Sequence, residues 1–410
     1  MNEVQPDSHI LDTYCQLADA RMEESCVFGI GAEIPRRKGD GPIPLSFSQE
    51  RIWFLEQYEP GGTLFNLPAS IPLHGQIDRG VIERALNEIV RRHESLRTTF
   101  ALDNGRPVQV IAQSRQIPLS FVDFSEGSDD SRQQRASQLL ADESKRTFDL
   151  ANGPLIRVLL VRLRDDFHLL FVIIHHIVSD AQSMAVFQCE LRTLIEELPQ
   201  GNLSLLPNLN IQYPDFAVWQ RNRFQGETLT SQLMYWRQAL AGLDFAPLAL
   251  PGARPRPPLP SYQARTNSFS LGESVSGQVD FMAQSLRLTP FVILLAGFKA
   301  LLFRYTRKAS LVVGFPAANR NRTELGALIG LFSNSLPVQT RFSTRTSFRD
   351  LLASVHEGTL AALAHQDLPF EKLVEELHPS RNLNFNPIFQ VMFDCKDQPC
   401  EDARQISLKT

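Results

Sequence analysis

The sequence predicts a large α/β protein built from two lobes. The chain has 410 residues, 43% of them hydrophobic and 21% charged, which is enough to bury an extensive core. Short β-rich runs alternate with longer segments of helical periodicity. Residues 245–262 are rich in proline and cannot form a helix or an inner strand, so we interpret this segment as a crossover between the lobes.

Composition argues against several classes of function. A net charge of −4 gives no support for nucleic-acid binding, which usually requires a basic surface. Five scattered cysteines suggest reduced thiols and a cytoplasmic protein. The N-terminus has no signal-peptide pattern. The longest apolar run, residues 291–303, is too short for a membrane span and contains Lys299, so we expect a buried core helix instead.

Two helices and a hairpin open the predicted globular region. Residues 45–61 form an amphipathic helix capped by Ser46 or Ser48. Its expected buried stripe is Ile52, Trp53, Leu55 and Tyr58. Residues 77–97 repeat apolar side chains at helical spacing and predict a second helix. After it, the turn at residues 103–105, Asp-Asn-Gly, predicts a hairpin between two short strands.

The remaining elements follow the same two periodicities. We expect helices at 129–146, from 213 onward and at 290–305, and strands at 155–163, 265–271 and 310–315.

The most informative stretch is a buried strand that ends in two histidines. Residues 169–174 are apolar and β-rich, and His175 and His176 follow them directly. Because adjacent strand residues face opposite sides, one imidazole should face a cavity and the other should pack inward. Asp180 stands at the N-cap position of the next amphipathic helix. This joint therefore delivers an imidazole and a carboxylate to one place.

Two interpretations of this joint compete. One is a core histidine with a capping aspartate. The other is a site in which an imidazole, which titrates near neutral pH, holds or moves a proton. A metal site is disfavoured, because adjacent histidines diverge and no Cys or carboxylate stands at ligand spacing.

The segment HHIVSDA, residues 175–181, resembles the HHxxxDG signature of the condensation domains of nonribosomal peptide synthetases, which belong to the chloramphenicol acetyltransferase-like superfamily. Six further segments resemble that family's motifs in the same order: LSFSQERIWFL (45–55), RHESLRTTF (92–100), YPDFAVW (213–219), IGLFSNSLPVQTR (329–341), HQDLPFE (365–371) and SRNLNFNPIFQVMF (380–393).

The resemblance implies a fold of two chloramphenicol acetyltransferase-like lobes, each a mixed sheet flanked by helices, arranged as a V with a central tunnel. The implied boundaries are a leader, linker or docking segment at 1–40, an N-terminal lobe with the histidine motif at 41–220, a helix and proline-rich crossover at 221–262, and a C-terminal lobe at 263–410. Family domains continue beyond the last motif, so this lobe is expected to be truncated.

The implied activity is amide-bond formation between two carrier-bound substrates. The donor is an acyl or peptidyl thioester, and the acceptor is an aminoacyl thioester whose amine attacks it. Both are held on 4′-phosphopantetheine arms of upstream and downstream peptidyl carrier domains, with an adenylation domain in the same assembly line. The resemblance is strongest to the type that accepts an L-configured donor, and it implies no bound cofactor or metal.

The resemblance also assigns roles to individual residues. His176 is implied as the catalytic imidazole, and His175 braces its loop. Asp180 points away from substrate and forms a salt bridge to an arginine, for which Arg320 is the candidate. Residues implied to line the tunnel are Ala181, Gln182, Ser333 and Asn334.

Departures from the motif keep other functions open. Ala181 stands where the family has glycine, so a non-catalytic module that recruits carrier proteins or tailoring enzymes is one alternative. A free-standing acyltransferase, dependent on CoA or a carrier, is another. Epimerisation domains differ after the histidine pair, and heterocyclisation domains replace it with aspartates.

Overall fold

The structure, a computed structural model, describes residues 33–39, 41–59, 61–200, 206–243, 246–253, 264–343, 345–377, 385–395 and 406–407. Most of the predicted leader at 1–40 and residues 254–262 of the predicted crossover lie outside this part. The chain divides into two compact units. The first comprises Met1–Gln220, Asn319–Phe332 and Asp402–Thr410, and the second comprises Arg221–Ala318 and Ser333–Glu401.

The first unit is built around a mixed sheet with helices packed on it. Its elements are β1 (Ile43–Pro44), α2 (Phe47–Tyr58), β2 (Asn66–His74), α3 (Arg79–Arg92), β3 (Thr98–Asp103), β4 (Arg106–Ile111), β5 (Leu119–Asp123), α4 (Asp129–Ser144), β6 (Ile156–Arg164), β7 (Phe167–His175), α5 (Ala181–Glu197) and β10 (Ile406–Ser407), with α6 (Tyr213–Arg223) reaching its boundary.

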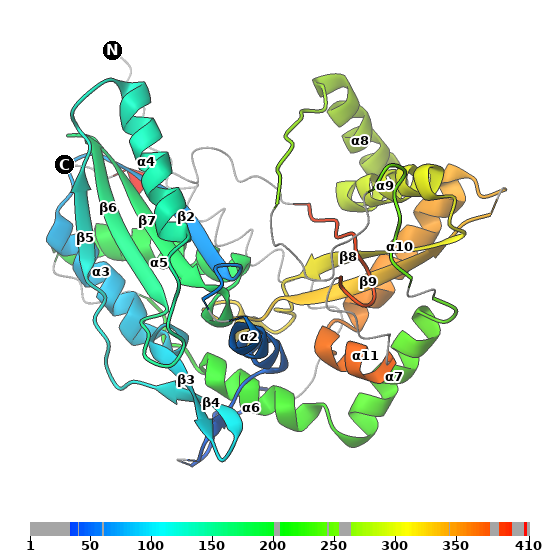
Figure 1. The fold of residues 1–410 in the computed structure, drawn as a ribbon, viewed down its shortest axis with the longest axis horizontal. Coiled ribbons are helices and arrows are strands. Elements are labelled where there is room, and N and C mark those ends of the chain that lie inside the picture. Colours follow the sequence, from blue (N-terminus) through cyan, green and yellow to red (C-terminus); the bar gives the residue numbers. More distant parts are fainter. Residues whose placement is uncertain are drawn as a thin grey trace. The chain divides into compact units, whose positions relative to one another are not determined.

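The central sheet has the strand order β10-β2-β7-β6-β5 (Figure 1). β7 pairs antiparallel with β2 and β6, while the outer pairs, β10 with β2 and β5 with β6, are parallel. Asn66 at the start of β2 lies opposite His175 at the end of β7. The histidine pair therefore emerges at one end of the middle strand.

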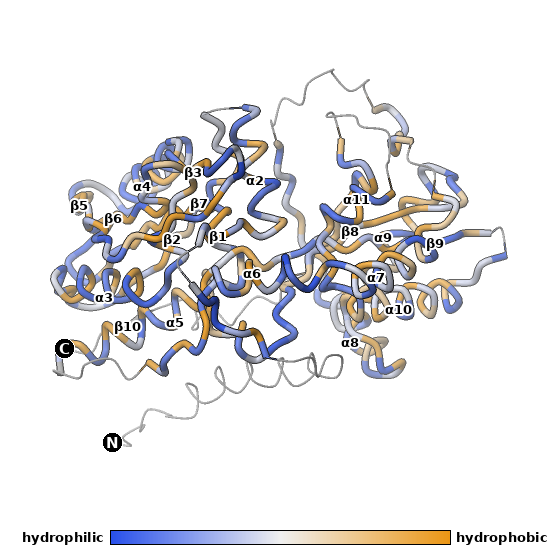
Figure 2. Tube along the Cα trace, turned by 90° about the horizontal axis from the view of Figure 1, so that it is seen from below, coloured by the Kyte–Doolittle hydropathy of each residue, from blue (hydrophilic) through white to orange (hydrophobic). Residues whose placement is uncertain are grey.

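β6 and β7 are apolar on both sides. Helices pack on both faces of this sheet and cover these apolar side chains. On β7, Leu170, Val172 and Ile174 belong to the core under α3 and α5, whereas Phe171 and Ile173 belong to the core under α4. Figure 2 shows hydrophobic residues gathered along β2 and β7. This alternation follows from the two-residue period of a strand and assigns His175 to the α4 side.

The predicted first helix is present as α2, and its start is well defined. Ser46 is the N-cap and forms a capping box with Gln49. Of the expected buried stripe, Ile52 is buried and Trp53 and Leu55 are partly buried. The prediction for Tyr58 is wrong, since this side chain in the last turn is 53% exposed.

The predicted second helix is shorter than expected. α3 ends at Arg92, and residues 94–97 form a separate 3-10 turn. The predicted hairpin is confirmed, with β3 and β4 antiparallel and positive φ at Asn104 and Gly105 in the turn.

The second unit is smaller and more helical. It contains α7 (Gly226–Ala239), α8 (Glu273–Leu286), α9 (Pro290–Thr306), β8 (Ser310–Ala317), β9 (Asn334–Arg341), α10 (Phe348–Ala364) and α11 (Phe370–Leu377). β8 and β9 are antiparallel, and Gly314 of β8 also exchanges backbone hydrogen bonds with Val391 and Phe393. The core of this unit lies between α9, α10 and β8.

One predicted strand is absent. Residues 265–271 are exposed and irregular, because no described strand lies beside them to pair with. Among the described residues, no single helix is long and apolar enough to cross a membrane, although α8 and α9, which meet at a bend of 113°, pass that test as a pair.

The chain returns from the second unit to the first at residues 319–332. The family resemblance predicts that this segment is part of a C-terminal lobe at 263–410. The structure instead packs Leu325, Leu328, Ile329, Leu331 and Phe332 into the core of the first unit.

Lys299 of α9 is fully buried. Its Nζ donates hydrogen bonds to the Val338 carbonyl and to Thr340 Oγ1, both at 2.8 Å. No carboxylate lies within ion-pairing distance among the residues that the structure describes. Burial lowers the pKa of Lys299 to about 7 from an ordinary value of 10.5.

We therefore expect the wild-type protein to gain stability with rising pH relative to Lys299→Met. Between pH 7 and 10.5 the unfolded chain binds a proton at Lys299 that the folded chain has released, so the free energy of unfolding rises across this window. The difference is at most about 5 kcal/mol. Urea unfolding of both proteins at pH 7 and 9.5 measures it, with Lys308→Met as a control that should show no such change. Parallel pH dependence of wild type and Lys299→Met would contradict the expectation.

Candidate functional site

His175 ends β7 with its side chain packed inward, 2% exposed. Its Nδ1 accepts a hydrogen bond from the Ile177 N–H at 3.2 Å, so in the neutral ring the proton is on Nε2. Nε2 lies 3.5 Å from Glu56 Oε1, and the ring packs against Phe65 and Phe148. This histidine holds the turn that follows it.

His176 begins that turn, a 3-10 turn at His176–Val178, and is partly exposed. Its backbone N–H donates to the Phe65 carbonyl, and its Nδ1 lies 2.7 Å from the Ser179 carbonyl. A carbonyl can only accept, so Nδ1 carries the proton and Nε2 of the neutral ring is unprotonated. No hydrogen-bond partner reaches Nε2 among the described residues. The geometry therefore leaves Nε2 able to accept a proton.

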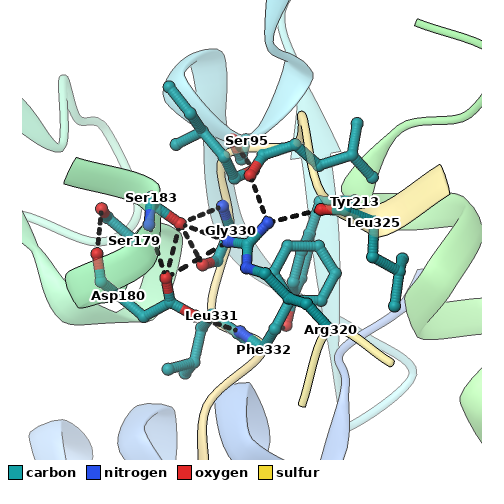
Figure 3. A network of polar contacts seen from close by, with 12 residues as sticks. Ser95, Ser179, Asp180, Ser183, Tyr213, Arg320, Leu325, Gly330, Leu331 and Phe332 are labelled. Carbon is teal, nitrogen blue, oxygen red and sulfur yellow. Dashed lines mark hydrogen bonds and ion pairs between the residues drawn. The ribbon is translucent and has the colours of Figure 1, made fainter. Parts of the chain in front are cut away.

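Asp180 is the N-cap of α5, as predicted, and is 1% exposed. Its Oδ1 accepts hydrogen bonds from the Ser183 N–H at 2.8 Å and the Ser183 hydroxyl at 2.7 Å. Oδ2 accepts from the Phe332 N–H at 3.0 Å. The predicted ion pair is also present, with Arg320 Nη2 at 3.2 Å from Oδ1 (Figure 3). The carboxylate thus joins the helix to residues far along the chain.

Arg320 is buried and all its recorded contacts are internal to the first unit. Nη1 donates to the carbonyls of Leu325 and Leu328, and the guanidinium lies over the Phe332 ring at 4.2 Å. Burial lowers the pKa of Arg320 from its ordinary value, and the charge of Asp180 opposes this. The arginine is therefore a structural partner of Asp180.

Residues 329–332, which we call the strap, run beside α5 and α6. The Gly330 N–H donates to Ser183 Oγ at 3.0 Å, and this hydroxyl also lies 2.8 Å from the Gly330 carbonyl. The Tyr213 hydroxyl donates to the Leu331 carbonyl at 2.8 Å. A Cβ on Gly330 would lie 2.0 Å from the Tyr213 ring, so only glycine fits.

The first residue of the strap is held by a buried polar cluster. The Ile329 N–H donates to His93 Nδ1 at 3.3 Å, and Ser95 Oγ donates to the Ile329 carbonyl at 2.7 Å. His93 Nε2 lies 2.9 Å from Glu190. Burial alone would raise the pKa of Glu190, but hydrogen bonds from His93 and Arg92 outweigh it and lower the pKa. Side chains therefore bond the strap backbone from Ile329 to Phe332.

The other residues assigned by resemblance lie in different settings. Ala181 and Gln182 are exposed in the first turn of α5, where an alanine methyl is compatible with helical backbone. Ser333 and Asn334 belong to the second unit. Asn334 is buried, donating to the carbonyls of Gln366 and Leu368, so its amide nitrogen is bonded within that unit.

The profile of the family described as "Condensation domain" matches residues 40–408. The chain belongs to the condensation-domain family. Condensation domains are parts of nonribosomal peptide synthetases, and as a family they are amide-bond-forming acyltransferases. The resemblance inferred from the seven motifs is thus confirmed, as is the fold class of mixed sheets flanked by helices.

Curated relatives of this condensation domain are large synthetases. A linear gramicidin synthase protein of Brevibacillus parabrevis is 42% identical over 374 residues, which cover 91% of this chain and 5% of that protein. Phosphinothricin tripeptide synthetase PhsC of Streptomyces viridochromogenes is 41% identical over 382 residues, 93% of this chain and 35% of that protein. The chain therefore spans about a twentieth of the first relative and about a third of the second.

Solved structures share the fold. The X-domain from teicoplanin biosynthesis has a TM-score of 0.78 and 29% identity, covering 88% of this chain and 79% of that one. The first condensation domain of the calcium-dependent antibiotic synthetase, with a substrate analogue bound, has a TM-score of 0.71 and 22% identity, covering 83% of this chain and 79% of that one.

Sequence reasoning missed several residues of this network. Ser183 was not singled out, although its place three residues after an N-cap is a signal for a capping bond. For Tyr213 the sequence predicts only that a helix begins there, and not a bond to the strap. Glu190 lies mid-helix, and only the folded chain brings it to His93.

Gly330→Ala should destabilise the first unit by about 1–3 kcal/mol, since the new methyl collides with the Tyr213 ring. Urea unfolding measures the loss. Gly277→Ala in α8 is the control, because its Cβ would meet nothing within 4 Å. Equal effects of the two substitutions would show that the strap tolerates displacement.

Asp180→Asn should cost about 3–5 kcal/mol, because it leaves Arg320 buried without its carboxylate. In the double variant Asp180→Asn/Arg320→Met the unpaired charge is gone, so part of the loss should return. A double-mutant cycle of unfolding free energies measures the coupling between the two side chains. Simple additivity would mean that the ion pair contributes nothing specific.

Proposed function

We propose that this condensation domain forms an amide bond between a donor acyl or peptidyl thioester and the amine of an acceptor aminoacyl thioester. The observation that carries the proposal is the state of His176. Its Nδ1–H is bonded to the Ser179 carbonyl, which orients the ring and leaves Nε2 of the neutral ring unprotonated, and the residue is partly exposed.

The proposed chemistry suits a single neutral imidazole. A thioester is already activated, so attack by an amine needs no strong base. The attack creates a tetrahedral oxyanion, and the amine must lose a proton. His176 Nε2 can hold the amine by accepting a hydrogen bond and then take its proton. Collapse of the oxyanion breaks the donor C–S bond. The departing thiolate takes the proton from His176, which leaves an amide, a free thiol on the donor arm and a neutral imidazole. Positioning of both substrates supplies much of the remaining acceleration.

Partners follow from the proposed reaction. Both substrates arrive on 4′-phosphopantetheine arms of an upstream and a downstream peptidyl carrier domain, in an assembly line with an adenylation domain, which we expect in the cytoplasm. We further propose an L-configured donor, a substrate path that passes the exposed Ala181 and Gln182, and no bound cofactor. The sequence identity to large synthetases, one of them a tripeptide synthetase, supports this.

Ala181 does not weaken the proposal on structural grounds. It replaces the glycine of the family motif, yet it occupies a helical position and the bonds of Asp180 are complete beside it. His176 likewise has its contact with the Ser179 carbonyl.

A second candidate is a non-catalytic module that recruits a tailoring enzyme. It is favoured by the 29% identity to the X-domain from teicoplanin biosynthesis, and by a solved complex of that X-domain with OxyB. A third candidate is a free-standing acyltransferase that acts on a soluble nucleophile. The SgcC5 protein from Streptomyces globisporus, which is 25% identical with a TM-score of 0.68 and covers 82% of this chain and 76% of that one, was solved in complex with a soluble diol.

The test is condensation between two loaded carrier proteins, followed by mass spectrometry of the dipeptidyl thioester. We expect product from wild type and a loss of about 10²–10⁴-fold in His176→Ala, as for removal of a general base. His74→Gln is the control, since His74 lies at the opposite end of the β2–β7 pair and should leave the rate unchanged.

The other outcomes separate the alternatives. Carrier binding without product would support the recruitment module. Product from a soluble amine, without the acceptor carrier, would support the free-standing acyltransferase. Full activity in His176→Ala would overturn the role of this imidazole.

A further inference from the structure

The first unit contains a cavity of about 410 Å³ that the proposed chemistry does not use. It lies between the end of α2, the β3 strand and the loop that follows α4. The residues that line it are Trp53, Glu56, Gln57, Gly61, Phe100, Ala101, Leu102, Phe148, Asp149, Leu150 and Ala151.

Glu56 contributes a largely buried side chain to the lining of this cavity. Its side chain is 10% exposed, and its one recorded polar contact is His175 Nε2 at 3.5 Å. That separation is long for an N–H···O hydrogen bond, whose usual range ends near 3.2 Å. No other donor reaches it among the residues that the structure describes. The carboxylate can accept further hydrogen bonds, and the cavity that Glu56 lines is where another donor would enter.

The charge of the lining has one sign. Asp149 is the second carboxylate, and hydrogen bonds from Asn152 and from the Ala151 and Asn152 N–H groups lower its pKa, so it is ionised at neutral pH. The described lining residues include no lysine, arginine or histidine. This combination favours a positively charged occupant.

Aromatic side chains form much of the remaining wall. Trp53, Phe100 and Phe148 contribute ring surface. The Phe148 ring already carries the guanidinium of Arg157 at 3.8 Å, whereas no cation lies over Trp53 in the described chain. Indole is the aromatic group that binds cations best. An apolar stem would pack on these rings while its charged end met Glu56.

We propose that this cavity binds a primary ammonium or guanidinium group carried on an apolar stem. Glu56 accepts its hydrogen bonds, and Trp53 covers its stem. Glu56 also contacts His175, so an occupant of the cavity would lie close to the residue that precedes His176 in the chain. Its use as the pocket for a cationic substrate side chain rests on the proposed function, whereas the binding itself does not.

The first experiment measures binding to the full chain by isothermal titration calorimetry. The probe is 2-phenylethylamine, and its neutral analogue is 2-phenylethanol. We expect the amine to bind at least about tenfold more tightly than the alcohol, and Glu56→Gln to remove that difference. Glu59→Gln, at the C-cap of the same helix but outside the lining, should leave it unchanged. Equal binding of amine and alcohol, or an unchanged preference in Glu56→Gln, would overturn the proposal.

A second variant protects the test against misfolding of Glu56→Gln. Ala101 is exposed at the cavity and lies on β3, so Ala101→Trp should occupy the space while the carboxylate of Glu56 is kept in the chain. It should abolish amine binding while circular dichroism and urea unfolding stay as in wild type. Retained binding in a folded Ala101→Trp protein would place the amine elsewhere.

The second experiment identifies the source of the cation. Carrier proteins loaded with lysyl or norleucyl donors are compared in the condensation assay. A lysyl preference of at least about fivefold, lost in Glu56→Gln, supports a carrier-bound side chain, while amine binding without preference supports a free amine as ligand. Amine binding lost in Glu56→Gln, with no condensation of either donor, would overturn the proposed function and leave the pocket standing.

Discussion

The carboxylate of Asp180 links three separate segments of the first unit. It receives hydrogen bonds from its own helix at Ser183, a guanidinium from Arg320 and a backbone N–H from Phe332. A buried charge is tolerated only when such partners surround it. The same carboxylate caps α5 directly after the turn that carries His176, so the position of that imidazole and the path of the strap are linked through one side chain.

The two adjacent histidines show how a backbone can give identical side chains different properties. His175 accepts an N–H at Nδ1, and His176 points Nδ1 at a carbonyl. The neutral rings therefore carry their protons on opposite nitrogens. One ring is held against Glu56 inside the unit, and the other presents a lone pair. The two rings differ because the strand ends at His175 and a 3-10 turn begins at His176.

Much of this could be predicted from local pattern. The β7 strand, the capping role of Asp180 and the hairpin at Asn104 follow from spacing alone, and the family motifs supplied the pairing with Arg320. The predicted burial of Tyr58 and the predicted strand at 265–271 are wrong, because burial and strand pairing depend on which segments lie alongside in the folded chain. Ser183, Tyr213 and the contact between His93 and Glu190 depend on the folded chain, where residues more than 90 positions apart meet, as with a separation of 97 for that pair.

The return of residues 319–332 to the first unit has a consequence for biosynthesis. A nascent chain that has reached Gln220 already contains Asp180 and Tyr213 but has not yet made the segment that satisfies them. At a translation rate of roughly 5–20 residues per second, several seconds pass before Phe332 emerges. The histidine loop therefore lacks Arg320 and the Phe332 N–H until most of the second unit has been made, and the first unit cannot reach its final form before that point.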